Sequence, residues 1–196
     1  MNNILKILIL FSIKSINAFS LQTIPYDNFT RYILESEDFI VRNGDLYNNY
    51  WHLDRYSAYK STRSGGCILT TKPLYIAGNF SLTAQILYKA EADIALRNIN
   101  LFNVIPFFKM NLSIEDNKVN ETIFYLSELK DVETIASVGE TFYMNAKTKN
   151  DKFIYSHINF NMNKTYQQGE MKICISNIIM DSELYIKNIV LDVIQK

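Results

Sequence analysis

The sequence predicts an all-β fold, an antiparallel two-sheet β-sandwich of the jelly-roll type with little helix. Short runs rich in Val, Ile, Tyr, Phe and Thr recur along the chain and are separated by Gly and Asn, which is typical of strands joined by turns. Apolar and polar residues alternate over 158–163 and 171–176, so the apolar side chains of each segment share one face. A barrel is the main alternative architecture.

The same patterns predict the individual elements. Turn signals stand at Asn43-Gly44, Gly65-Gly66, Gly78-Asn79 and Gly169. Helix signals are few: residues 88–97 have the propensities of a short helix, and 27–35 and 127–133 have those of single helical turns. The segments expected as strands are, in order, 38–42, 47–53, 67–71, 80–88, 93–97, 104–112, 122–126, 141–146, 158–163, 171–176 and 184–193.

The N-terminal segment Met1–Ala18 has the features of a secretory signal peptide. Its apolar run, residues 4–13, is too short to span a bilayer, and the small residue Ala18 marks the expected cleavage point. We therefore expect a secreted, extracellular protein whose residues 19–196 form a single β-sandwich domain.

Charge and hydropathy exclude several classes of partner. Removal of the signal segment takes away Lys6 and Lys14 and leaves 18 basic against 20 acidic side chains. A nearly neutral chain without a Lys/Arg cluster is not expected to bind nucleic acid. No later segment reaches the roughly 20 apolar residues of a membrane-spanning helix. The run 186–194 is interrupted by charged residues, so no membrane anchor is expected.

In a secreted protein, cysteines can form disulfides and asparagines in sequons can be glycosylated. The two cysteines, Cys67 and Cys174, are expected to form a disulfide in an oxidising compartment, with two buried free thiols as the alternative. Five Asn-x-Ser/Thr sequons predict N-glycosylation sites that face solvent. They begin at Asn28, Asn79, Asn111, Asn120 and Asn163.

Three stretches resemble MAM-type and galactose-binding-like jelly-roll domains. They are Glu37-Asp38-Phe39 with the following 50–53, the glycine-led segment 65–74, and the closing segments 169–174 and 182–189. The resemblance covers the ends of the chain. It implies an extracellular adhesion or recognition module without catalysis.

Catalytic and metal-binding patterns are sparse. His52 and Asp54 would share a face of a strand, but two solvated polar residues at a strand end are the simpler interpretation. No nucleophile elbow, zinc-protease motif or phosphate loop occurs, so we expect no enzyme activity and no cofactor, and no metal-ligand set is assigned. A structural Ca²⁺ is the one cofactor considered, with Glu35, Glu37 and Asp38 as first candidates.

The densest aromatic stretch begins at Tyr47 and includes Trp51, which we expect in the core. The loop that follows, 54–66, has no apolar period and is expected to be the contact surface. Its candidate ligand-binding residues are Arg55, Tyr56, Tyr59 and Arg63.

The sequence thus predicts a secreted glycoprotein that acts as a non-catalytic recognition module for a glycan or a protein surface. A secreted carrier that holds a hydrophobic ligand between its sheets is the alternative, and a secreted hydrolase is a third class. A packed interior favours the binder and a hollow one favours the carrier. The sequence gives no oligomeric state.

Overall fold

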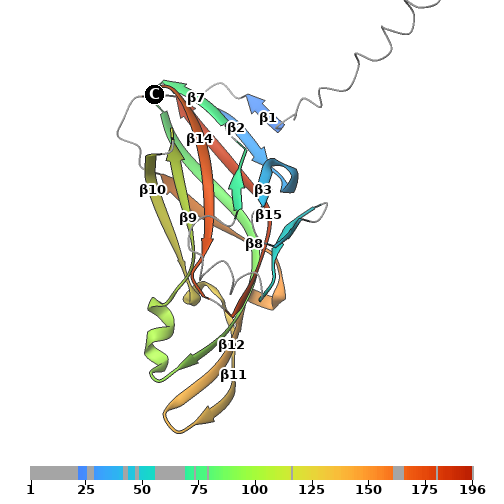
Figure 1. Cartoon of the computed structure of the whole chain (residues 1–196), viewed down its shortest axis with the longest axis vertical. Coiled ribbons are helices and arrows are strands. Elements are labelled where there is room, and N and C mark those ends of the chain that lie inside the picture. Colours follow the sequence, from blue (N-terminus) through green and yellow to red (C-terminus); the bar gives the residue numbers. More distant parts are fainter. Residues whose placement is uncertain are drawn as a thin grey trace, which may run out of the picture.

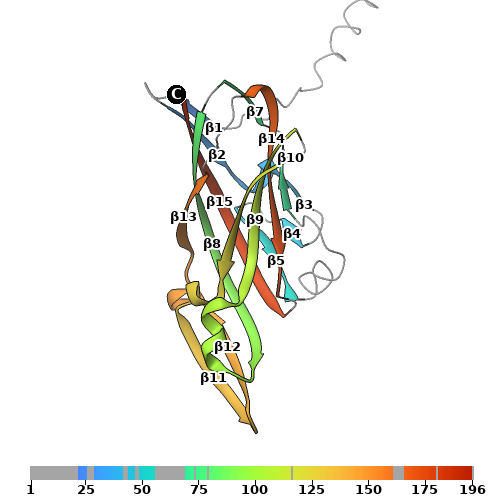
Figure 2. The ribbon, with the colours of Figure 1, turned by 90° about the vertical axis from the view of Figure 1, so that its left-hand side faces the viewer.

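The fold is a sandwich of two antiparallel sheets (Figures 1 and 2). The predicted all-β sandwich is thus confirmed, and the described strands do not form the alternative barrel. The structure is a computed structural model. It describes residues 22–25, 29–41, 44–46, 49–55, 69–72, 74–78, 80–115, 117–160, 166–179 and 181–195. The signal segment lies outside these residues, so it and the domain boundary at residue 19 stay predictions.

The nine-stranded sheet is organised around two long central strands, β8 (Phe80–Leu96) and β15 (Ser182–Gln195). The main strand order is β1-β2-β15-β8-β12-β11. Strand β13 pairs with the first half of β8, and β5 pairs with β15 and β4. The other strands are β1 (Gln22–Pro25), β2 (Phe29–Leu34), β4 (Asp45–Leu46), β5 (Trp51–Leu53), β11 (Asp131–Val138), β12 (Thr141–Lys147) and β13 (Ile154–Phe160).

The six-stranded sheet has the order β10-β9-β14-β6-β3, with β7 paired to β14. Its strands are β3 (Phe39–Val41), β6 (Leu69–Thr71), β7 (Leu74–Gly78), β9 (Pro106–Ile114), β10 (Asn117–Tyr125) and β14 (Tyr166–Asn177). Four short 3₁₀ segments complete the described elements: η1 (Ser36–Asp38), η2 (Ile99–Val104), η3 (Leu126–Glu128) and η4 (Lys149–Asp151). None of the helices in the described ranges has the length and apolar character needed to cross a membrane.

The core between the sheets is filled by aromatic rings. Tyr88 of β8 meets Phe108 of β9 edge-on at 5.3 Å between ring centroids, and Phe108 stacks on Phe124 of β10 at 4.1 Å. Burial raises the pKa of the Tyr88 hydroxyl, and the nearby Glu128 carboxylate, which accepts its hydrogen bond, raises it further. Trp51 is completely buried, as the sequence led us to expect.

The predicted alternation decides which side chains enter this core. Met171, Ile173 and Ile175 of β14 point inward and are buried. Ile158 of β13 is buried in the same way. Gly44 occupies the predicted turn with φ of +94°, and a Cβ there would lie 2.5 Å from the carbonyl oxygen of His52. Only glycine accommodates both conditions at this close approach.

Several element predictions were wrong. Residues 88–97 are not helical, because they continue the single strand β8, and 29–34 form the strand β2. Residues 131–138 form the edge strand β11, which the sequence reading missed. Gly169 lies inside β14, at an irregularity in its pairing with β7, and not in a turn. The turn between β11 and β12 is at Gly139, whose φ is +58°.

The hairpin β11–β12 and the end of β8 project from one end of the sandwich (Figures 1 and 2). The C-terminus of the chain lies at the opposite end. All eight residues of β11 are exposed. This projection leaves the side chains of β11 and Tyr143 of β12 available to solvent.

Candidate binding face

Of the four predicted ligand-binding residues, only Arg55 lies among the described residues. It follows β5 directly, and Tyr56, Tyr59 and Arg63 lie outside the described part of the chain. Their role as a contact surface therefore stays a prediction. The guanidinium of Arg55 forms ion pairs with carboxylates of neighbouring strands.

Four carboxylates surround the Arg55 guanidinium. Its Nη2 lies 3.0 Å from Glu91 Oε1, its Nη1 lies 2.9 Å from Asp181 Oδ1, and its Nε lies 3.3 Å from Glu183 Oε1. Nη1 also donates to Asp93 Oδ2. The arginine thus joins the chain after β5 to β8, to β15 and to the turn that precedes β15.

The strand registers explain why these acids meet. Glu91 and Asp93 are two residues apart on β8 and therefore point to the same, outward face of the sheet. Glu183 of β15 is the register partner of Glu91, and Asn145 of β12 is the register partner of Asp93. The Asn145 amide donates to Glu91 Oε1 at 2.7 Å and to Asp93 Oδ1 at 2.8 Å.

Two charged groups of this network have shifted pKa values, Arg55 and Glu183. Partial burial lowers the pKa of Arg55, but the hydrogen bonds to Asp93 and Asp181 and the charges of both carboxylates outweigh burial and raise it above its usual range. For Glu183, burial acts in the opposite direction and raises the pKa. The hydrogen bond from Tyr185 and the positive charges of His52 and Arg55 outweigh burial and bring the pKa of Glu183 below its ordinary value. The lowered pKa favours the carboxylate form of Glu183.

An aromatic pair adjoins the network. His52 stacks on Tyr185 with ring centroids 4.1 Å apart, and its Nε2 lies 3.5 Å from Glu183 Oε2. The Lys89 ammonium lies 4.9 Å from the centroid of the Tyr185 ring. His52 thus contacts two residues of β15, Tyr185 and Glu183.

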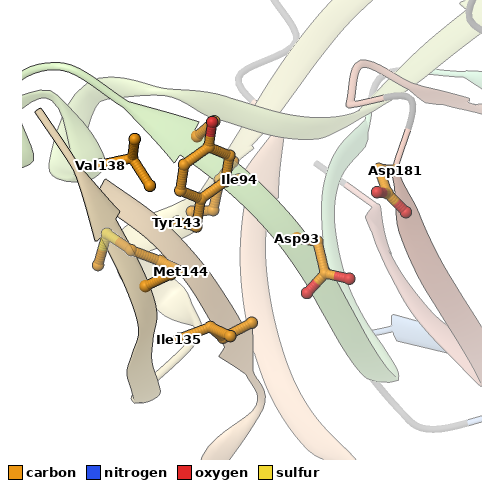
Figure 3. Close-up of a pocket in the computed structure, with 9 residues that line it drawn as sticks. Asp93, Ile94, Ile135, Val138, Tyr143, Met144 and Asp181 are labelled. Carbon is orange, nitrogen blue, oxygen red and sulfur yellow. The ribbon is translucent and has the colours of Figure 1, made fainter. Parts of the chain in front are cut away.

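An apolar groove of about 590 Å³ lies beside the network on the projecting end of the sheet (Figure 3). Tyr143 of β12 pairs with Ala95 of β8 on one side and with Ala136 of β11 on the other. These small neighbours leave a hollow next to the tyrosine ring. Asp93 and Asp181 form the acidic end, and the remaining apolar lining is Ile94, Ile135, Val138 and Met144.

A second, polar groove of about 460 Å³ adjoins the other end of the same β11–β12 pair. Its lining includes Lys130, Asp131, Glu133, Asn145 and Lys147. Tyr143, Asn145 and Lys147 are alternate residues of β12 and share its outward face. We call this outward row and the two grooves the binding face.

Sequence reasoning missed most of the binding face. The sequence pattern placed Glu91 between two predicted strands, 80–88 and 93–97, where the structure has the single strand β8. The alternation Lys89, Glu91, Asp93 with alanines between them was the signal of a half-exposed strand. The pattern Asp181, Glu183, Tyr185 carries the same signal on β15.

The predicted disulfide involves Cys67, which lies outside the described residues, so the bond stays a prediction. Cys174 is half-buried on β14, and its register partner is Thr70, three residues after Cys67.

The two sequon asparagines among the described residues lie on the six-stranded sheet, Asn111 on β9 and Asn120 on β10. Asn111 is on a strand paired on both sides, and its Oδ1 is buried with no hydrogen-bond partner among the described atoms. Asn28, Asn79 and Asn163 lie outside the described residues. The β11–β12 hairpin contains no sequon.

The predicted calcium candidates make a turn. Asp38 is buried, and its Oδ2 accepts a hydrogen bond from the Glu35 backbone at 3.0 Å. The Lys72 ammonium donates to the Glu37 carbonyl at 2.5 Å. Among the described residues, no group of three or more His, Cys, Asp or Glu side chains is arranged to hold a metal ion.

No protein-family model and no curated protein matches this chain. Its sandwich is similar to solved structures at low identity. One is carbohydrate-binding module CBM36 in complex with calcium and xylotriose (9% identity, 81% of this chain and 96% of that chain, TM-score 0.35). Another is the CBM36-1 domain of a multidomain xylanase from the hindgut metagenome of Trinervitermes trinervoides (11%, 82% and 95%, TM-score 0.38).

The δ-endotoxin Cry8Ea1 of Bacillus thuringiensis is also similar, at 18% identity over 64% of this chain with a TM-score of 0.32. This chain spans only 18% of the length of that toxin chain. The function proposed below rests on the geometry of the binding face.

Proposed function

We propose that this protein is a secreted, non-catalytic recognition module that binds a glycan on the binding face. The observation that carries the proposal is the outward row Tyr143, Asn145 and Lys147 of β12, which has an apolar groove at one end and a polar groove at the other. A sugar presents both an apolar ring face and a set of hydroxyls, and the two grooves offer a complement to each.

Tyr143 supplies the apolar contact. Its side chain is 43% exposed, and the small residues Ala95 and Ala136 flank it in the sheet. An exposed tyrosine ring offers a flat, rigid face with a low cost in conformational entropy, on which the C–H face of a pyranose ring can lie.

The polar groove supplies hydrogen bonds of both kinds. Lys130 and Lys147 are donors, whereas Asp131 and Glu133 are acceptors. The Asn145 NH₂ group is already bonded to Glu91 and Asp93, so Asn145 offers a ligand its Oδ1 acceptor. A sugar hydroxyl both donates and accepts, so such a mixed set satisfies it.

The binding face is also pre-organised. The Asn145 amide is held by Glu91 and Asp93, and the Asp131 carboxylate accepts a hydrogen bond from the Asn150 backbone. Side chains held on paired strands lose little further freedom when a ligand binds.

The rival functions are less well supported. A glycosidase needs a carboxylic acid with a raised pKa, whereas the pKa of Glu183 is lowered and its neighbours Glu91, Asp93 and Asp181 share the Arg55 guanidinium. A hydrophobic carrier needs space between the sheets, whereas Tyr88, Phe108 and Phe124 fill the described core with rings in mutual contact.

Replacing Tyr143 with alanine tests the proposal. After an oligosaccharide panel has identified the best binder, we expect Tyr143→Ala to weaken its affinity by a factor of about 5–150, equivalent to about 1–3 kcal/mol for an aromatic anchor. Tyr143→Phe keeps the ring and should bind within about threefold of the wild type. Isothermal titration calorimetry measures both affinities.

Tyr155→Ala is the matched control, because Tyr155 is an exposed tyrosine on β13, away from both grooves. Its affinity should equal that of the wild type. Unchanged binding by Tyr143→Ala, or no binding of any oligosaccharide by the wild type, would contradict the proposal.

Secretion and processing are part of the same proposal. Protein secreted from a eukaryotic host should begin near Phe19, contain a Cys67–Cys174 disulfide and carry glycan at Asn120. Asn111 should remain unmodified because its side-chain oxygen is buried in the middle of a sheet. Non-reducing peptide mapping by mass spectrometry reads all four features, and a mature chain that retains Met1 contradicts the secretion proposal.

A further inference from the structure

The apolar groove of the binding face carries charge of one sign only. Asp93 and Asp181 line its acidic end, and their side chains are 34% and 62% exposed. No lysine, arginine or histidine is among the residues that line this groove. The neighbouring polar groove, in contrast, has two lysines and two acids.

The surrounding network does not cancel this charge. Among the described residues, four carboxylates share the Arg55 guanidinium, and the Lys147 ammonium lies 3.5 Å from Glu91 Oε1. His52 faces Glu183 and is not in the lining of the groove. An excess of negative charge therefore remains beside an apolar surface, where field lines are focused and screening is weaker than in bulk water.

The positions of the groups match a ligand with two parts. Figure 3 shows Asp93 and Asp181 on one side of the pocket, and Tyr143, Val138 and Ile135 on the other. A ring that rests on Tyr143 would thus carry a substituent into the acidic end. A cationic substituent is attracted there, whereas a carboxylate or a sulfate is repelled.

We propose that this groove selects a glycan that contains amino sugars with free, protonated amines. The sugar ring contacts Tyr143, and its ammonium group lies against the exposed carboxylate of Asp181, with Asp93 beside it. This inference rests on the proposed glycan-binding function and adds the charge class of the ligand. Glycans built from uronic acids or sulfated sugars are disfavoured by the same charges.

The test compares three oligosaccharides of equal length: glucosamine oligomers with free amines, the same oligomers N-acetylated, and galacturonic acid oligomers. Titrations are made at about pH 6, which is below the usual pKa of an amine and above that of a carboxyl group. We expect the free-amine oligomer to bind at least about tenfold more tightly than the N-acetylated one, which corresponds to about 1.4 kcal/mol. Added salt should reduce this preference, and the galacturonic acid oligomer should bind most weakly.

Asp181→Asn removes one charge and keeps the shape of the side chain. It should abolish most of the preference for free amines, so that the ratio of the free-amine affinity to the N-acetylated affinity approaches one. A cooperative thermal unfolding transition shows that the variant is folded. Glu140→Gln is the matched control, because Glu140 is an exposed acid in the β11–β12 turn and outside the groove lining. It should retain the preference of the wild type.

The outcomes separate the two proposals. Equal binding of the free-amine and N-acetylated oligomers, a preference for galacturonic acid, or an amine preference that survives Asp181→Asn overturns the inference about charge. In each of these cases, binding that depends on Tyr143 leaves the glycan-binding function standing. If no oligosaccharide binds in a way that depends on Tyr143, both the charge preference and the glycan-binding function are overturned.

Discussion

Replacing Trp51 with alanine is expected to lower the free energy of unfolding by about 3–5 kcal/mol, the range observed when a buried aromatic residue is truncated. The side chain is fully buried, and Trp51 pairs in register with the buried Ile186 of β15. A cavity at this point removes contacts on the inner side of the nine-stranded sheet. Chemical denaturation followed by circular dichroism measures the loss.

Tyr143→Ala is the informative comparison for Trp51→Ala. Tyr143 is an exposed ring in the same sheet, so its truncation should change stability by no more than about 0.5 kcal/mol. The two aromatic residues thus have opposite expected profiles: Trp51 supports stability, and Tyr143 supports binding. A stable Trp51→Ala protein that has lost its ligand would show that the tryptophan is part of the site.

Replacing Arg55 with alanine is expected to lower the free energy of unfolding by about 1–3 kcal/mol at neutral pH. Removal of the guanidinium leaves Glu91, Asp93, Asp181 and Glu183 close together without their common counter-ion. Breaking a fully buried ion pair costs more, but Arg55 is about one-third exposed and solvent screens part of the repulsion.

The loss of unfolding free energy in Arg55→Ala should become smaller as the pH falls. Arg55 is one of the groups that hold the pKa of Glu183 below its ordinary value, so its stabilisation is present at neutral pH and disappears as the pH falls through the folded-state pKa. Protonation of the acids in the variant also relieves their repulsion. The difference between wild type and variant should therefore shrink below about pH 4.

Arg97→Ala serves as the control, because Arg97 is an exposed arginine directly after β8 and outside the network. It should leave stability nearly unchanged at every pH. A loss for Arg55→Ala that is equal at pH 7 and pH 3 would contradict the electrostatic explanation and point to a packing role for the side chain.

The contribution of the sequence is clearest where a strand is half-buried. The alternation in 171–176 identified the buried residues of β14 correctly, because a strand turns every second side chain to the same side. It identified Ile158 for the same reason. The edge strand β11 escaped, because all of its residues are exposed and apolar Val132, Ile135 and Val138 do not mark a buried face.

The site shows the limit of this reasoning. Glu91 and Asp93 were visible as acids, and their spacing placed them on one face once the segment was known to be a strand. Their meeting with Glu183 and Arg55 was not visible, because these residues are 92 and 36 positions from Glu91 along the chain. The predicted contact residues of the loop 54–66 were chosen because loops carry function and because this loop has no apolar period.

The sequence by itself determined the all-β class, the inward face of β14 and the near-neutral charge of the chain. These depend on composition and on the period of side chains along one strand. The tertiary structure decided which strands are neighbours and in which register, and a shift of one residue would have turned every side chain of a strand to the opposite face. The pairing of β15 with β8 and of β8 with β12 brings the Arg55 network and the Tyr143 grooves together. That pairing results from long-range packing, which the local pattern of residues does not encode.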